Sequence, residues 1–89
     1  MMICKKCYVS GHVQGVWFRD TTRKTAMQLN LHGHAINLPD GRVEVVVCGP
    51  VNAVNELVDW LWTGSPMSQV TGVDCQEINL IETEKFSIG

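Results

Sequence analysis

The spacing of apolar residues predicts a chain in which strands and helices follow one another. Apolar residues that alternate with polar ones, the pattern of a half-buried strand, occur over residues 3–10, 34–38, 42–48, 70–80 (where the alternation is irregular) and 85–88. Apolar residues three and four positions apart predict amphipathic helices over residues 18–30 and 51–62. Gly33 follows the first helix closely and is its expected stop signal.

The order of these segments, β-α-β-β-α-β with a short final β, predicts a single α+β domain over residues 1–89. Two helices interleaved among the strands favour a ferredoxin-like split βαβ fold, in which an antiparallel sheet carries both helices on one face. Right-handed crossovers place the first and third strands side by side at the centre, running in opposite directions. A chain of 89 residues leaves no room for a second core.

The two central strands determine how the cysteines can pair. Side chains alternate across a strand, so Cys4 and Cys7 point to opposite faces of the first strand. Antiparallel pairing brings Cys4 near Cys48 on the face away from the helices, which makes a Cys4–Cys48 disulfide geometrically possible. A reducing cytoplasm favours two free thiols instead. The sequence has no second close cysteine pair to complete a tetrahedral zinc site, so we expect no metal.

Charge and composition narrow the classes of function. A net charge of −2 provides no basic field for nucleic acid or an anionic membrane. No apolar stretch approaches the roughly 20 residues that a membrane span needs, and the N-terminus becomes polar too early for a signal peptide. On the predicted open sheet face only Tyr8 is a clear aromatic residue, which disfavours single-stranded RNA binding by base stacking. We expect a monomeric, cytoplasmic protein.

The clearest candidate chemistry lies in the loop between the first strand and the first helix. Gly11 and Gly15 can adopt positive φ and bring bare backbone close to a ligand. A loop that leads into a helix N-terminus also turns backbone N–H groups toward an anion. Arg19 adds a planar fork of donors suited to phosphate or carboxylate oxygens. The loop lacks the glycine patterns of nucleotide-binding loops. The same spacing also fits an ordinary strand-to-helix turn with a solvated arginine.

These residues resemble the motifs of a known family. The acylphosphatase motif G-x-V-Q-G-V-x-F-R is matched at every specified position by Gly11-His12-Val13-Gln14-Gly15-Val16-Trp17-Phe18-Arg19. The family's second motif, a glycine with an asparagine four residues later and then a G-x-V turn, is similar to Gly33, Asn37 and the run 41–43. The run 86–88 resembles the family's last strand. The likeness covers nearly the whole chain.

The resemblance implies hydrolysis of a small-molecule acyl phosphate to a carboxylate and inorganic phosphate, with phosphate acting as product and inhibitor. It also implies no metal, no cofactor and no phosphoenzyme. By resemblance Arg19 binds the phosphoryl group and Asn37 positions the attacking water. Main-chain donors come from the loop residues Gly11, His12, Val13, Gln14, Gly15, Val16 and Trp17. The side chain of Gln14 is expected to brace the loop.

The sequence departs from the family pattern at two positions close to Asn37, and again at its end. His34 stands where the family usually has an aromatic ring, and Ile36 replaces a residue that is often basic. The run after Ile88 lacks the family's basic and aromatic tail. We therefore expect a looser alignment of the water and a weaker docking of the C-terminus. The alternative function is a non-catalytic phosphate- or protein-binding module on the same fold.

Overall fold

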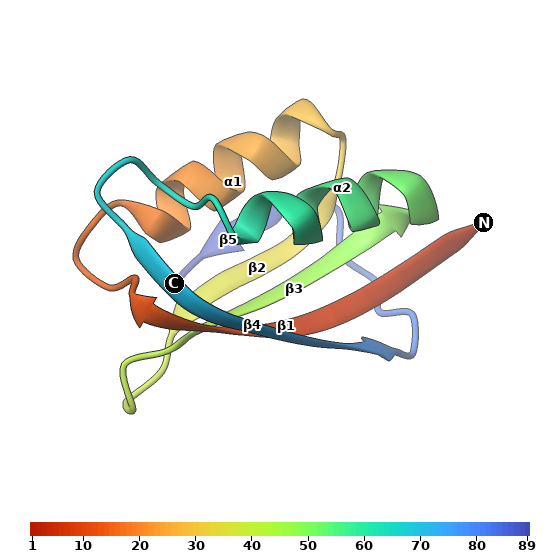
Figure 1. Ribbon diagram of the computed structural model, residues 1–89. Coiled ribbons are helices and arrows are strands. Elements are labelled where there is room, and N and C mark those ends of the chain that lie inside the picture. Colours follow the sequence, from red (N-terminus) through yellow and green to blue (C-terminus); the bar gives the residue numbers. More distant parts are fainter.

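The computed structural model describes residues 1–89, which form a five-stranded sheet in the order β4-β1-β3-β2-β5 with two helices on one face (Figure 1). The elements are β1 (Met2–His12), α1 (Phe18–Gln28), β2 (His32–Asn37), β3 (Val43–Pro50), α2 (Val51–Leu61), β4 (Gln69–Ile78) and β5 (Phe86–Ile88). This is the predicted ferredoxin-like α+β fold. No helix is long and apolar enough to cross a membrane.

The central pair β1 and β3 is antiparallel, as predicted, and the last strand is the exception in the sheet. Strand β5 runs parallel to β2, with Phe86 opposite Gly33. The connection 79–85 leaves β4 at the end of the sheet where β2 begins, since Ile78 lies opposite Cys4 in β1. Strand β5 therefore starts at that end and runs alongside β2 in the same direction.

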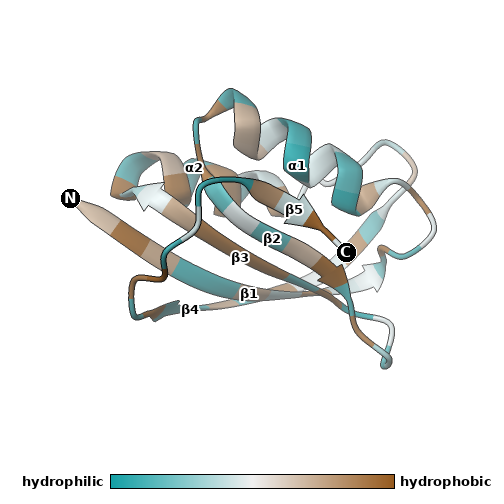
Figure 2. Ribbon diagram, turned by 180° about the vertical axis from the view of Figure 1, so that it is seen from behind, coloured by the Kyte–Doolittle hydropathy of each residue, from teal (hydrophilic) through white to brown (hydrophobic).

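The core lies between the sheet and the helices, and the alternation of residues along the strands accounts for it. Figure 2 shows β3 as largely hydrophobic, whereas α1 carries hydrophilic bands. Helix α1 buries Phe18 and Ala26, and α2 buries Leu57 and Leu61. A buried leucine or phenylalanine contributes about 1.5–3 kcal/mol relative to an exposed one. The apolar side of each helix thus packs against the sheet. This packing also places the loop that leads into α1.

Helix α1 ends earlier than predicted, at Gln28. The signal is Asn30, which takes a left-handed φ of 57°, while the amide of Leu31 donates a hydrogen bond to the carbonyl of Ala26 at 2.9 Å. Asparagine is the side chain other than glycine that most often tolerates this conformation at a helix end. The predicted stop, Gly33, serves a different purpose: a Cβ there would lie 1.8 Å from the backbone oxygen of Val46 in β3.

Two disulfides connect β1 to both of its neighbours. Cys4 is bonded to Cys48 of β3, and Cys7 is bonded to Cys75 of β4, so no cysteine is free. The first bridge lies on the face away from the helices and the second faces the main core, in line with the predicted alternation. The structure differs here from the free thiols that a reducing cytoplasm favours. The second pairing was not predicted.

Candidate functional site

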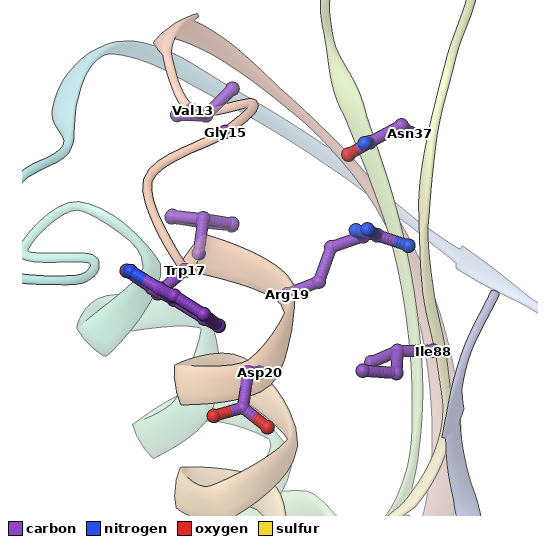
Figure 3. Close-up of a pocket in the computed structure, with 8 residues that line it drawn as sticks. Val13, Gly15, Trp17, Arg19, Asp20, Asn37 and Ile88 are labelled. Carbon is purple, nitrogen blue, oxygen red and sulfur yellow. The ribbon is translucent and has the colours of Figure 1, made fainter.

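A cavity of about 320 Å³ brings together residues from both ends and the middle of the chain. It lies where the loop 13–17 enters α1, beside the last residue of β2 and the end of β5. Figure 3 shows its walls, which are formed by Val13, Gly15, Trp17, Phe18, Arg19, Asp20, Asn37 and Ile88. The cavity therefore has a polar part, made of loop backbone and two polar donors, and an apolar part.

The loop 13–17 keeps its backbone donors free. Gly15 and Trp17 have positive φ values of 75° and 64°, and none of the N–H groups of residues 14–17 donates a hydrogen bond to a backbone acceptor. Successive N–H groups around left-handed residues form concavities that bind anions. Apart from the residues next to it in the chain, no protein atom lies within 4 Å of a Cβ placed on Gly15. An anion could therefore approach the bare backbone at this residue.

A buried side chain holds this loop from behind. The hydroxyl of Ser65, in the loop after α2, donates a hydrogen bond to the carbonyl oxygen of Val16 at 2.7 Å. Both residues are buried. The contact turns the Val16 carbonyl toward the protein interior, and it connects loops that lie far apart in the sequence but side by side in Figure 1.

Arg19 is the cation of the site. Of the three arginines, Arg23 forms an ion pair with Asp20 and Arg42 forms one with Asp40, whereas Arg19 has neither an ion pair nor a side-chain hydrogen bond. Figure 3 shows the Arg19 guanidinium extending from the first turn of α1 to lie between Asn37 and Ile88. A guanidinium without a protein partner has all of its donors available for a planar oxyanion.

Asp20 also lines the cavity, but Figure 3 shows its carboxylate turned along α1, away from the Arg19 guanidinium. Its carboxylate lies 3.0 Å from the guanidinium of Arg23 and 3.2 Å from the ammonium of Lys24. The hydrogen bond from Lys24 is the largest cause that holds the pKa of Asp20 below its ordinary value, and the two cations add to it. These pairs engage the carboxylate, so its negative charge opposes an anion in the cavity less than a free carboxylate would.

Asn37 is the last residue of β2, and its carboxamide has no hydrogen-bond partner in the protein. Figure 3 shows it pointing toward the loop, above the Arg19 guanidinium.

The Gln14 side chain binds the turn that follows Asn37. Its amide nitrogen donates hydrogen bonds to the carbonyl oxygens of Leu38 at 2.8 Å and Arg42 at 2.9 Å. Gln14 thus braces the loop, as expected, and does not face the cavity.

The structure brings only part of the predicted loop to the cavity. Val13, Gly15 and Trp17 line it, whereas Gly11 and His12 belong to β1 and pair with β4. The departures at positions 34 and 36 point to the open face of the sheet, where the ring of His34 lies 2.9 Å from the carboxylate of Glu44. Asn37 points to the other face because side chains alternate along β2.

Three lining residues escaped sequence reasoning, namely Phe18, Asp20 and Ile88. Phe18 is part of the motif but was not named among the site residues, and it also joins the core. Ile88 reaches the cavity because β5 adds to the edge of β2, and no local signal in the sequence indicates that pairing. The proximity of Asp20 to Arg19 was visible in the sequence, but its orientation depends on the two cations that follow it in α1.

Comparison with known proteins gives a consistent result. The family described as Acylphosphatase matches residues 5–88 of this chain. An acylphosphatase of Chromohalobacter salexigens is 48% identical over 86 residues, which cover 97% of this chain and 96% of that protein. The structure of an acylphosphatase from Coxiella burnetii superposes with a TM-score of 0.95 at 40% identity, covering 99% of this chain and 93% of that one. For the crystal structure of acylphosphatase from Bacillus subtilis the TM-score is 0.92 at 38% identity, over 100% and 99% of the two chains.

Proposed function

This chain belongs to the acylphosphatase family, and we propose that it cleaves the carboxyl–phosphate bond of a small acyl phosphate by direct attack of water on a phosphoryl group held beside Arg19. The observation that supports this proposal most directly is that hydrogen-bond donors without protein partners gather around one cavity. An unpaired guanidinium, unpaired loop amides and an unpaired carboxamide face the same space. Free donors that converge on one cavity can bind the oxygens of a single anion together.

The loop amides and Arg19 have the chemistry to hold the phosphoryl group. In phosphoryl transfer, charge spreads over three equatorial oxygens, and catalysis consists mainly of positioning and charge stabilisation. The free N–H groups of residues 14–17 and the Arg19 fork supply fixed donors for those oxygens. An acyl phosphate has a good leaving group, because the departing carboxylate is a weak base. The site therefore needs no strong general acid.

Asn37 has the chemistry to orient the water. A neutral carboxamide can accept a hydrogen bond from water and direct its lone pair at phosphorus without repelling the phosphate dianion. A carboxylate at this place would add electrostatic repulsion. In Figure 3 the Asn37 carboxamide and the Arg19 guanidinium lie side by side. A water held by Asn37 would thus stand next to a phosphoryl group held by Arg19.

The test is an assay of benzoyl phosphate hydrolysis with a metal chelator present and inorganic phosphate as a competitive inhibitor. We expect the chelator to leave the rate unchanged. Arg19→Ala should lower kcat/KM by about 10³-fold or more, since an arginine that stabilises phosphoryl transfer contributes about 10³–10⁵-fold. The matched control is Lys6→Ala, which removes a cation from the opposite face of the sheet. Loss of activity in chelator would contradict the proposal, and phosphate binding without hydrolysis would favour the binding-module alternative.

Hydrolysis in ¹⁸O-labelled water tests where the water attacks. Attack at phosphorus places the label in inorganic phosphate, and attack at the carbonyl carbon places it in the carboxylate. We expect the label in phosphate after a single turnover. Trapping by acid during turnover should show no phosphorylated protein, because the water reacts directly. Label in the carboxylate, or a covalent phosphoprotein, would contradict direct attack.

A further inference from the structure

Trp17 is the most unusual residue of the cavity wall. Its side chain is 73% exposed, although it is one of the largest apolar groups in the chain. Its backbone has a left-handed φ of 64°, which few residues other than glycine and asparagine adopt readily. Neither burial nor backbone geometry accounts for a tryptophan here.

The other apolar members of the wall offer less surface. Val13 and Phe18 are each 1% exposed and belong to the hydrophobic core. Ile88 is half-buried at the edge of the sheet, on the side of Arg19 and Asn37 (Figure 3). Trp17 is therefore the one wall residue that can present a broad aromatic face to a bound molecule.

The geometry of the reaction places the acyl group near this face. In phosphoryl transfer the attacking and leaving oxygens lie roughly in line, on opposite sides of phosphorus. If Asn37 holds the water, the leaving carboxylate points away from Asn37. Trp17 lines the same cavity, and Figure 3 shows its ring beside the start of α1, on the side away from Asn37 and Arg19. The acyl group of a bound substrate would thus extend toward Trp17.

We propose that Trp17 is the specificity-determining contact for the acyl group, and that it favours aromatic and bulky apolar acyl phosphates over acetyl phosphate. This inference rests on the proposed function, because it uses the position of the water at Asn37. An offset or edge-to-face contact between rings is favourable beyond the area that it buries. An acetyl group is too small to cover the indole. Both substrates bind in the same way through the phosphoryl group. The contact with the acyl group therefore determines the ratio of their kcat/KM values.

The kinetic test compares benzoyl phosphate with acetyl phosphate in wild type and in Trp17→Ala. We expect the ratio of the two kcat/KM values to fall about fivefold, which is in the range of a single aromatic contact. The inhibition constant of inorganic phosphate should stay within about twofold. Trp17→Gly is the second variant, because glycine relieves the left-handed backbone while removing the ring. Trp62→Ala, which removes an exposed indole outside the cavity, is the control and should leave the ratio unchanged.

The outcomes separate this inference from the proposed function. If the ratio of the two kcat/KM values is unchanged in both Trp17 variants, Trp17 does not determine specificity, whatever the absolute rates of the variants. A second measurement needs no turnover and compares the affinities of phenylphosphonate and methylphosphonate by NMR titration. Phenylphosphonate should bind more tightly to wild type, and the two affinities should become similar in both Trp17 variants. If wild type hydrolyses no acyl phosphate, the proposed function fails while this measurement still tests the contact. Equal affinities of the two phosphonates in wild type would overturn the inference.

Discussion

The side-chain amide of Gln14 donates a hydrogen bond to the carbonyl oxygen of Leu38, at 2.8 Å, and Leu38 directly follows Asn37. The same nitrogen donates to the carbonyl of Arg42 at 2.9 Å, so that one side chain spans the turn between β2 and β3. The backbone of Gln14 belongs to the loop proposed to hold the phosphoryl group. Gln14 thus connects the two parts of the site whose relative position matters most for the reaction.

Replacing Gln14 should lower turnover more than phosphate binding. Gln14→Ala frees the turn after Asn37, and a displacement of about 1 Å in a reacting group can cost up to about 10²-fold in rate. We expect kcat for benzoyl phosphate to fall about 10-fold, with the phosphate inhibition constant changed by less than about threefold. Gln14→Glu should be worse, because an ionised carboxylate only accepts hydrogen bonds and would repel the two carbonyl oxygens. Gln76→Ala, an exposed glutamine on β4, is the control. Equal losses in kcat and phosphate affinity would argue against a positioning role.

Ser65 should stabilise both the fold and the loop. Ser65→Ala leaves the buried carbonyl of Val16 without its side-chain donor, and an unsatisfied buried acceptor costs about 1–3 kcal/mol. We expect the free energy of unfolding in urea to fall by about that amount and phosphate binding to weaken with it. Ser87→Ala, at an exposed position in β5, should change neither. Wild-type stability in Ser65→Ala would show that the hydrogen bond contributes little.

The carboxylate of Asp20 should make stability depend on pH in the acid range. The hydrogen bond from Lys24, with smaller contributions from both neighbouring cations, holds the pKa of Asp20 below its ordinary value of 3.8. A pKa that is lower in the folded state gives stability that is complete above the unfolded-state pKa and disappears as the pH falls through the folded-state pKa. Asp20→Asn should therefore be less stable than wild type near neutral pH.

The difference should vanish at low pH. Urea unfolding of wild type and Asp20→Asn, followed from pH 7 down to about pH 2, measures it. Asp74→Asn, which removes an exposed carboxylate without an ion pair, controls for the change in net charge. A difference that stays constant across this range would contradict the assignment of the effect to the Asp20 ion pairs.

The Cys4–Cys48 disulfide should contribute a large part of the stability. Its partners are 44 residues apart, and chain-entropy estimates for a loop of this size give about 4 kcal/mol. Replacing both cysteines by alanine should lower the unfolding free energy by about this amount in non-reducing buffer. Denatured wild-type protein should also gain no mass on alkylation unless it is first reduced. Alkylation without reductant would contradict the pairing. Such bridges are rare in cytoplasmic proteins, which is evidence against the expected location.

The fold could be predicted largely from the sequence, because its strands and helices have clear periodicities. The alternation around Val43 and Val45 predicted the buried face of β3, and the two helical stripes predicted which helix residues are buried. The direction of β5 could not be predicted, since its pairing with β2 depends on where β4 ends. The Cys7–Cys75 bridge was missed because β4 alternates irregularly, so that the residue opposite Cys7 in the neighbouring strand could not be read from the sequence.

The site residues that belong to a sequence motif could be predicted. The features of the site that depend on tertiary packing could not. Arg19 and Asn37 were named from the sequence and lie together at the cavity. The exposure of Trp17 was not foreseen, because a tryptophan is usually assigned to apolar packing. The contact between Ser65 and Val16 joins loops 49 residues apart in the sequence, and no spacing rule links such positions.

The central claim is that Arg19 and the loop amides hold the phosphoryl group while Asn37 aims the water. The most direct measurement is the effect of Asn37→Ala on kcat for benzoyl phosphate and, separately, on the inhibition constant of inorganic phosphate. The account predicts that kcat falls by about 10²-fold or more while the phosphate constant stays within about threefold. A kcat close to that of wild type would contradict it.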